Sequence, residues 1–419
     1  MKCGFLSEKG TFPILHQVYA SLQIEEFSSF ISSQYEVKSF LNQRDFDGVE
    51  VARQFQKYAY IACDEVDENA HKAKLVNCIR NQDGRLIGTN TDYEGIKYTF
   101  ISKHVDLQNK VVLIVGNAQN AKVVKTVCED MGAKSVKNIF YKPSYGYITY
   151  KEAYSKYKDA DILINTISVG RNLQEDNLPI DLSKFSNVSF VFDLIYTPLL
   201  TRLLLEAKKR NIPYSNGLSA FVYSHICNLE FFENKKLEAD PEAIKLQLIK
   251  NQCNIVFIGM PSAGKSTTGR RVRGHIHKRW IDLDNQIVHE EEKPIAHLFE
   301  ELGENGYREI ESRIVKKFAG KSGLIISTGG GVISRDINMI LLSQNGILIH
   351  LNRPLEFLKR KDSRRPILKN NKIEDLFEAR FPIYQKYADF TIDTENSIED
   401  AIQKVLKLVD DEQTYNKFK

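Results

Sequence analysis

A phosphate-binding loop is the clearest chemical signal in the sequence. Residues 259–266 are Gly-Met-Pro-Ser-Ala-Gly-Lys-Ser, a complete G-x-x-x-x-G-K-S pattern. Glycines at these positions let the backbone curl so that its N–H groups converge on phosphate oxygens. Lys265 would reach the β- and γ-phosphates, and Ser266 would offer an oxygen to Mg²⁺. We therefore expect ATP and Mg²⁺ here, with nucleotide contacts from Gly259, Ala263, Gly264, Lys265, Ser266 and Thr267.

Such a loop needs a strand before it and a helix after it. Residues 254–258 form an apolar, β-branched run that predicts a buried strand ending at Gly259. A helix that begins directly after the loop would add its positive end to the anion site. A second pair of this kind, residues 111–115 followed by Gly116, predicts a further nucleotide-type domain upstream. Similar runs alternate with helical stretches throughout, which predicts an α/β fold with mostly parallel sheets.

Candidate residues for the phosphoryl acceptor follow the loop. Asp282 and Asp284 occupy alternate positions in a short predicted strand, so we expect both carboxylates on one face, toward the phosphates. One would support the metal, and the other would accept a proton from a substrate hydroxyl. Gly329, Gly330 and Gly331 end another apolar run and permit close backbone approach to a ligand. Taken singly, an acidic strand end or a lone arginine is more often a solvated surface group.

The order of the motifs over residues 254–410 resembles that of shikimate kinase. After the loop come Asp-x-Asp, Gly-Glu-x-x-Tyr-Arg-x-x-Glu at 303–311, Gly-Gly-Gly, Arg-Pro-Ile-Leu at 365–368 and Arg-x-Pro-x-Tyr at 380–384. This resemblance implies phosphorylation of the 3-hydroxyl of shikimate by Mg²⁺-ATP, in chorismate and aromatic amino acid biosynthesis. It also implies a three-layer α/β/α P-loop domain like that of nucleoside monophosphate kinases.

The resemblance also assigns roles to individual residues. Arg308, Arg380 and the glycines at 329–331 would hold the carboxylate and ring of shikimate. Asp284 would act on the attacking hydroxyl, and Asp282 would support the metal site with Ser266. Two further arginines belong to the nucleotide side: Arg360 as a nucleotide contact, and Arg365 on a lid at roughly 361–372 that meets the transferring phosphate. A different small-molecule or nucleotide kinase on the same frame is the alternative.

Residues 1–235 resemble shikimate dehydrogenase, with a substrate domain followed by a Rossmann-like dinucleotide domain. Val-Asn at 76–77, Gly-x-Asn-Thr-Asp-x-x-Gly at 88–95, and the segments at 161–166 and 193–201 carry this resemblance. It implies substrate contacts at Asn77 and Asp92, Asp92 being half of a catalytic Lys–Asp pair. Gly116 and Tyr196 are the corresponding positions in the dinucleotide domain.

Several positions that bear the dehydrogenase chemistry are altered. The family's Ser-x-Ser-Pro is Gly-Thr-Phe-Pro at 10–13, and its Asn-Val-Thr-x-Pro-x-Lys is the stretch 50–56. The expected proton carrier is therefore Gln56, whose amide neither donates nor accepts a proton at neutral pH. Glu50 places negative charge where an anionic ligand should bind, and Ala118 adds a methyl group where pyrophosphate should approach. We expect an inactive dehydrogenase-like domain, with NADP(H) binding left open.

Three other interpretations of the N-terminal half stay open. In the first, it is a working dehydrogenase that makes the chain bifunctional, reducing 3-dehydroshikimate with NADPH. In the second, it is a divergent active enzyme that uses Lys57 in place of the missing lysine, although that side chain should point elsewhere. In the third, it is a binding or scaffolding module that senses a pathway ligand or mediates assembly.

Size and composition limit the remaining possibilities. The chain has 419 residues, 42% hydrophobic and 27% charged, which is ordinary for a globular protein of two to four domains. Its net charge of +4 is too small to predict a nucleic-acid partner. We expect a cytoplasmic protein without a membrane span. Because its six cysteines are scattered, we also expect their thiols to be reduced. The predicted domains are 1–100 (substrate), 101–235 (Rossmann-like), a linker at 236–252 and 253–412 (P-loop kinase).

Overall fold

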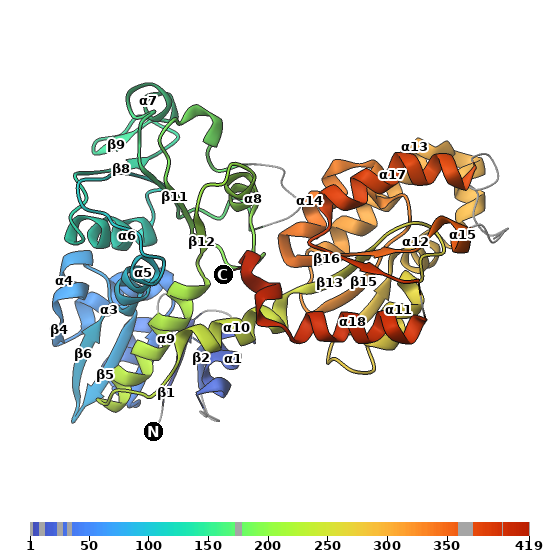
Figure 1. The fold of residues 1–419 in the computed structure, drawn as a ribbon. Helices are drawn as coiled ribbons and strands as arrows, with labels where there is room; N and C mark the ends of the chain where they lie inside the picture. Colours follow the sequence, from blue (N-terminus) through green and yellow to red (C-terminus); the bar gives the residue numbers. More distant parts are fainter. Residues whose placement is uncertain are drawn as a thin grey trace. The chain divides into compact units, whose positions relative to one another are not determined.

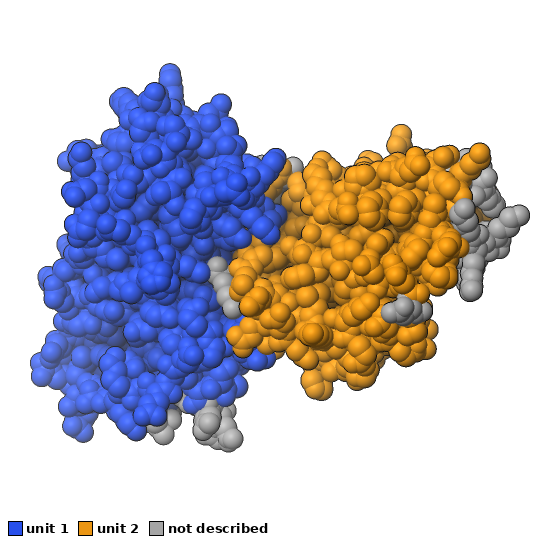
Figure 2. Space-filling view, in the orientation of Figure 1, with its two compact units in different colours: residues 1–169, 178–196, 203–248 blue, residues 170–177, 197–202, 249–419 orange. Residues whose placement is uncertain are grey.

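The chain forms a mixed α/β fold with three sheets (Figure 1). The computed structural model describes residues 3–7, 13–22, 28–31, 36–171, 178–358, 372–395 and 397–418. These divide into two compact units, coloured blue and orange in Figure 2. Unit 1 comprises residues 1–169, 178–196 and 203–248, and unit 2 comprises 170–177, 197–202 and 249–419. The predicted α/β class with parallel sheets is confirmed.

The first sheet of unit 1 is mixed, with strand order β2-β1-β3-β5-β6-β4. β1 pairs in parallel with β2 and β3, whereas β5 runs antiparallel to β3 and β6. A core that includes Leu41, Val49 and Ile79 packs against it. Its elements are β1 (Cys3–Ser7), α1 (Pro13–Ser21), β2 (Ser28–Ile31), α2 (Val37–Gln43), β3 (Gly48–Val51), η1 (Arg53–Phe55), α3 (Gln56–Ala62), β4 (Glu65–Val66), α4 (Glu68–Ala73), β5 (Cys78–Gln82), β6 (Arg85–Thr89) and α5 (Thr91–Ser102).

The second sheet of unit 1 is fully parallel, in the order β12-β11-β10-β7-β8-β9. Its central strand is the apolar run predicted upstream of Gly116, and four of its five residues are buried. Helices cover a parallel sheet, so such strands stay apolar on both faces. The elements are β7 (Val111–Val115), α6 (Gln119–Asp130), β8 (Ser135–Ile139), β9 (Tyr147–Ile148), α7 (Tyr150–Lys156), β10 (Ile162–Asn165), η2 (Leu182–Lys184), β11 (Phe190–Asp193), α8 (Arg202–Lys209), β12 (Tyr214–Asn216) and α9 (Leu218–Glu233).

Helix α9 returns to the first sheet of unit 1 and packs on α5 and β5 (Figure 1). The two helices approach closely at Gly95, where a Cβ atom would lie 2.2 Å from the carbonyl oxygen of Ala220. Only a glycine permits this contact. The packing brings polar residues of α9 over the carboxyl end of β3, which matters for the unit 1 site described below.

The segment predicted as a linker is largely helical. Asp240 accepts hydrogen bonds from the backbone N–H groups of Glu242 and Ala243, and α10 (Pro241–Gln252) follows. The helix starts here because aspartate is a good N-cap and proline suits the first turn. The boundary between the two units falls inside α10, after Leu248. Each helix among the described residues is too short or too polar to span a bilayer.

Unit 2 is a five-stranded parallel sheet in the order β14-β15-β13-β16-β17. Helices cover both faces: α11 and α18 lie on one side, and α13, α14 and α17 on the other (Figure 1). Its elements are β13 (Asn254–Ile258), α11 (Lys265–Val272), β14 (Arg279–Asp282), α12 (Leu283–Glu291), α13 (Ile295–Ala319), β15 (Leu324–Ser327), η3 (Val332–Ser334), α14 (Asp336–Asn345), β16 (Gly346–Asn352), α15 (Leu355–Leu358), α17 (Ile373–Tyr387), β17 (Phe390–Asp393), α18 (Ile398–Asp410) and η4 (Glu412–Phe418).

Candidate active site

The phosphate-binding loop connects the central strand β13 to α11, as predicted. Ser262 (φ 68°) and Gly264 (φ 94°) adopt the left-handed conformation that turns the chain tightly. Lys265 is 7% exposed, and its ammonium donates to the carbonyl oxygens of Gly259 (2.8 Å) and Met260 (2.9 Å). No side chain of the described residues caps the start of α11, so its first N–H groups face the loop's concavity. These features suit a polyphosphate.

Two side-chain oxygens that could bind a metal ion, one from Ser266 and one from Asp282, lie next to each other beside the loop. Ser266 Oγ donates to Asp282 Oδ2 at 2.5 Å, and Asp282 Oδ1 accepts from the backbone N–H of Asn285 at 3.1 Å. The prediction that Asp282 and Asp284 share one face of a strand is wrong. Asp282 ends β14 and caps α12, so Asp284 lies in the first turn of that helix. An aspartate that satisfies a free N–H group starts a helix, which the alternating pattern alone does not reveal.

The glycine turn brings the predicted acceptor residues together. It follows β15, and a Cβ atom on Gly329 would lie 2.6 Å from Asp284 Oδ1. A Cβ on Gly331 would lie 2.2 Å from Arg308 Nη2, so only glycine leaves room for these side chains. The Gly330 carbonyl accepts from Arg380 Nη1 at 3.1 Å. The turn thus gathers a carboxylate and two guanidinium groups that are distant in sequence.

Arg308 is held in place by two carboxylates on its own helix. It donates to Glu311 Oε2 (2.8 Å) and Glu304 Oε1 (3.2 Å) and is only 5% exposed. Burial lowers the pKa of Arg308, but Glu311 and Glu304 outweigh burial, so the pKa is raised above its ordinary value. The stacked rings of Phe299 and Tyr307 lie beneath its guanidinium group. The site therefore presents a fixed, permanently charged planar group suited to a carboxylate.

Three residues at the candidate site carried no assigned role from the sequence. Glu311 fixes Arg308 and could have been found from its i+3 spacing on a helix. Tyr384 donates to the Gly330 carbonyl at 2.5 Å, and its ring stacks on His350. His350 lies in an apolar strand next to the loop, where the sequence gives no distinctive signal.

The remaining predicted residues divide between described and undescribed parts of the chain. Ala263 is buried and Thr267 is half-buried at the start of α11. Arg360 and Arg365 lie outside the described residues, as does the predicted lid except for its last residue. Their roles stay predictions.

In unit 1, the predicted dehydrogenase positions also lie together. Gln56 is 5% exposed and hydrogen-bonds to the half-buried Asp92. Burial raises the pKa of Asp92, although Arg53, His225 and Gln56 oppose the rise. Lys57 was expected to point away from the position of Gln56, and it is exposed where Gln56 is buried. An amide therefore stands where the resemblance places the proton-carrying lysine.

A closed polar network surrounds this pair. Glu50 Oε1 accepts from Asn228 Nδ2 at 2.6 Å, and Glu50 Oε2 lies 3.4 Å from His225 Nε2. Thr91 Oγ1 donates to Asn228 Oδ1 at 2.5 Å, and Asn77 Nδ2 donates to Thr91 Oγ1 at 3.0 Å. Burial opposes the charged imidazole, but Glu50 outweighs it and raises the pKa of His225. Asn77, a predicted substrate contact, is thus engaged with the protein itself.

The dinucleotide half keeps its turn but alters the loop that follows. Gly116 has φ 122°, and a Cβ there would lie 2.5 Å from Thr166 Oγ1. Thr166 Oγ1 in turn donates to the Val115 carbonyl at 2.7 Å. Tyr196 is half-buried, and its ring lies 4.7 Å from that of Phe221 on α9. Both predicted positions are ordered by contacts within the protein.

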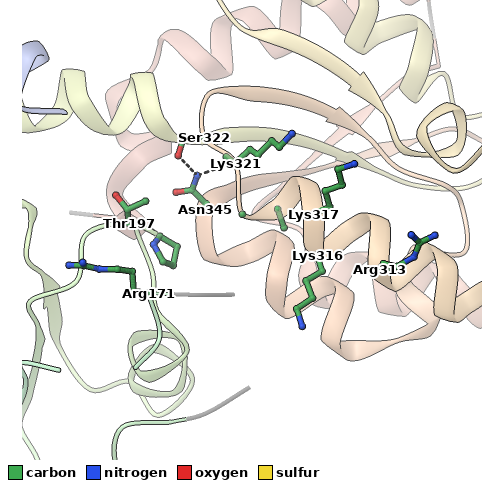
Figure 3. Close-up of a pocket in the computed structure, with 11 residues that line it drawn as sticks. Arg171, Thr197, Arg313, Lys316, Lys317, Lys321, Ser322 and Asn345 are labelled. Carbon is green, nitrogen blue, oxygen red and sulfur yellow. Dashed lines mark hydrogen bonds between the residues drawn. The ribbon is translucent and has the colours of Figure 1, made fainter. Parts of the chain in front are cut away.

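A separate pocket of about 620 Å³ lies at the amino-terminal ends of strands in the unit 2 sheet, opposite the end that carries the phosphate loop (Figure 3). Lys321, Ser322 and Asn345 line it, and they stand just before the strands β15 and β16 begin. The labelled cationic side chains extend in different directions rather than toward one centre. Open parallel sheets bind ligands at the carboxyl ends of their strands, so this pocket lies at the other end of the sheet from the phosphate-binding loop.

The comparisons with known proteins fall into two groups. The shikimate kinase family model matches residues 261–410. A shikimate kinase of Persephonella marina is 40% identical over 147 residues, which are 34% of this chain and 89% of that protein. A shikimate kinase of Clostridium beijerinckii is 39% identical over 159 residues, covering 37% of this chain and 94% of that protein.

The second group concerns the N-terminal part. Shikimate dehydrogenase 1 of Peptoclostridium difficile has a TM-score of 0.52 and 25% identity, covering 59% of this chain and 98% of that one. The shikimate 5-dehydrogenase of Thermus thermophilus, solved with NADP(H) and shikimate, has a TM-score of 0.53 and 21% identity, covering 59% and 98%. These similarities establish a shikimate dehydrogenase-like fold there, and at such identities they establish the fold alone.

Proposed function

Because the chain belongs to the shikimate kinase family through residues 261–410, we propose that it transfers the γ-phosphoryl group of ATP to the 3-hydroxyl of shikimate. We place this activity in a kinase domain at 253–412. The observation that carries the proposal is the glycine turn at 329–331, which gathers Asp284, Arg308 and Arg380 at the sheet edge where the phosphate loop opens.

On the donor side, we propose that the phosphates displace the loop's own carbonyl groups from Lys265. The ammonium now bound to Gly259 and Met260 would then neutralise charge on the β- and γ-phosphates. Ser266 and Asp282 fit Mg²⁺, because both present oxygen donors and already lie within 2.5 Å of each other. When bound, the metal supplies further neutralisation of phosphate charge.

On the acceptor side, the buried guanidinium groups of Arg308 and Arg380 would bind the substrate carboxylate. Asp284 would orient the attacking hydroxyl and accept its proton. Phosphoryl transfer needs positioning and charge neutralisation more than covalent chemistry, and these groups would supply the positioning of the acceptor. Arg365 and Arg360 complete the proposal as the lid and nucleotide arginines.

The test is ADP release by the full chain with Mg²⁺-ATP and one of two acceptors. We expect turnover that depends on shikimate and none with a nucleoside monophosphate. Lys265→Ala should abolish shikimate-dependent turnover, whereas Lys316→Ala at the opposite sheet edge should not change it. Turnover with the nucleotide acceptor, or none with either acceptor, would refute the proposal.

For unit 1, we propose that the dehydrogenase-like domain does not reduce 3-dehydroshikimate. The supporting observation is Gln56 beside Asp92, since loss of a general acid or base costs about 10²–10⁴ in rate. The alternative, a bifunctional enzyme, predicts loss of NADPH absorbance when 3-dehydroshikimate is added. A signal at high enzyme concentration would establish the alternative, and binding of NADP(H) can be measured separately by calorimetry.

A further inference from the structure

A buried imidazole lies between the phosphate loop and helix α17, the helix that carries Arg380. His350 is 1% exposed and pairs across the sheet with Ile258, the residue just before the loop. A Cβ atom on Gly259 would lie 3.4 Å from His350 Cδ2. The Cδ2 edge of the ring therefore lies next to the first residue of the phosphate loop.

The other side of the imidazole packs on α17. The His350 ring stacks on Tyr384, with centroids 5.1 Å apart and planes inclined by 16°. The edge of Phe381 closes the stack at 5.8 Å and 64°. The imidazole thus lies between the first residue of the loop and this helix, in a buried place where a change of side-chain shape is felt by its neighbours.

Helix α17 in turn holds the acceptor side. The Tyr384 hydroxyl and Arg380 Nη1 both donate to the carbonyl of Gly330, at 2.5 and 3.1 Å. The turn also touches the loop directly, since a Cβ atom on Gly330 would lie 2.7 Å from Pro261 Cδ. The loop, the imidazole, the helix and the glycine turn are thus linked to one another by a closed circuit of contacts.

The imidazole has no acid–base task in this arrangement. Its Nδ1 atom is buried and has no hydrogen-bond partner among the described residues. Burial and the nearby Lys265 ammonium lower the pKa of His350 to about 4, so the ring is neutral near pH 7. A buried polar atom without a hydrogen-bond partner lowers the stability of the fold, so the nitrogen does not explain why a histidine stands here. The ring instead contacts its neighbours through its flat shape.

We propose that His350 is a positioning residue, whose flat ring sets the distance between the nucleotide held by the phosphate loop and the acceptor held by the glycine turn. This inference rests on the proposed kinase function. A displacement of about 1 Å between reacting groups can cost about 100-fold in rate, so a change in this distance should lower kcat.

Two substitutions separate shape from chemistry. His350→Phe keeps a flat ring and removes both nitrogens, whereas His350→Leu keeps an apolar side chain and removes the flat ring. We expect His350→Leu to lower kcat about 10- to 100-fold, with both KM values within about threefold of the parent. His350→Phe should keep kcat within about threefold, with an unchanged pH profile.

Phe318→Leu is the matched control, since it removes a buried ring near the opposite edge of the same sheet. It should lower the melting temperature as much as His350→Leu without lowering kcat. Equal kcat losses in His350→Phe and His350→Leu, or full activity in both, would overturn the inference. Absence of shikimate-dependent turnover in the parent would instead overturn the proposed function, so the two failures are distinguishable.

Discussion

Replacing Arg380 with alanine tests the acceptor site at one side chain. Arg380 is 9% exposed, and its Nη1 donates to the Gly330 carbonyl. The Tyr384 hydroxyl holds the same carbonyl, so the glycine turn should survive the substitution. The change should therefore remove the proposed substrate contact while leaving the backbone in place.

The size of the effect follows from the hydrogen bond that is lost. A hydrogen bond to a charged group contributes about 1.5–3 kcal/mol, which corresponds to about 10- to 150-fold in kcat/KM. We expect that loss for shikimate, mostly as a higher KM, and a KM for ATP within about threefold of the parent. Steady-state ADP release with each substrate varied in turn measures both quantities.

The control is Arg313→Ala, which removes a half-exposed guanidinium paired with Glu290 and Glu291 at the opposite sheet edge. Exposed ion pairs of this kind contribute about 0–1 kcal/mol, so both KM values should stay close to those of the parent. The reasoning is refuted if Arg380→Ala leaves the shikimate KM unchanged, or if it raises the two KM values equally.

Three further predictions concern the metal donors and unit 1. Asp282→Asn should lower kcat at least about tenfold and raise the Mg²⁺ concentration for half-maximal activity, and an unchanged Mg²⁺ titration would contradict this. His225 faces Glu50, Asp92, the Tyr19 ring and the Phe221 carbonyl, and its pKa is raised in the folded protein. Protonation of His225 therefore stabilises unit 1, fully below the ordinary pKa of 6.5. This stabilisation is lost as the pH rises through the pKa of the folded state. The melting-temperature difference between the parent and His225→Ala should therefore be larger near about pH 6 than near about pH 9, and equal differences would refute it. With NADPH and 3-dehydroshikimate, the parent should show no loss of NADPH absorbance, since Gln56 carries no transferable proton.

Local motifs made much of unit 2 predictable. The strand at 254–258, the phosphate loop and the helix after it lie where the sequence placed them, because glycine and lysine at fixed spacing have few other structural uses. The placement of Asp284 failed because alternation along a strand does not reveal where a capping aspartate ends it. The resemblance supplied the approach of Arg308 and Arg380, which a single sequence cannot show.

Other features depend on tertiary packing and left no pattern in the sequence. His350 belongs to an apolar strand, and its stack on Tyr384 joins residues from different elements. In unit 1, the sequence predicted that Glu50 would place negative charge in the site, but not that Asn228 and His225 from α9 would engage it. Such partners emerge only once the helices and sheets are assembled.

The most direct test of the account is the identity of the product made by the full chain from Mg²⁺-ATP and shikimate. Phosphorus NMR of the reaction mixture should show one new phosphate monoester on shikimate for each ADP formed. ADP and inorganic phosphate without a phosphorylated shikimate would contradict the claim that unit 2 transfers phosphate to this acceptor.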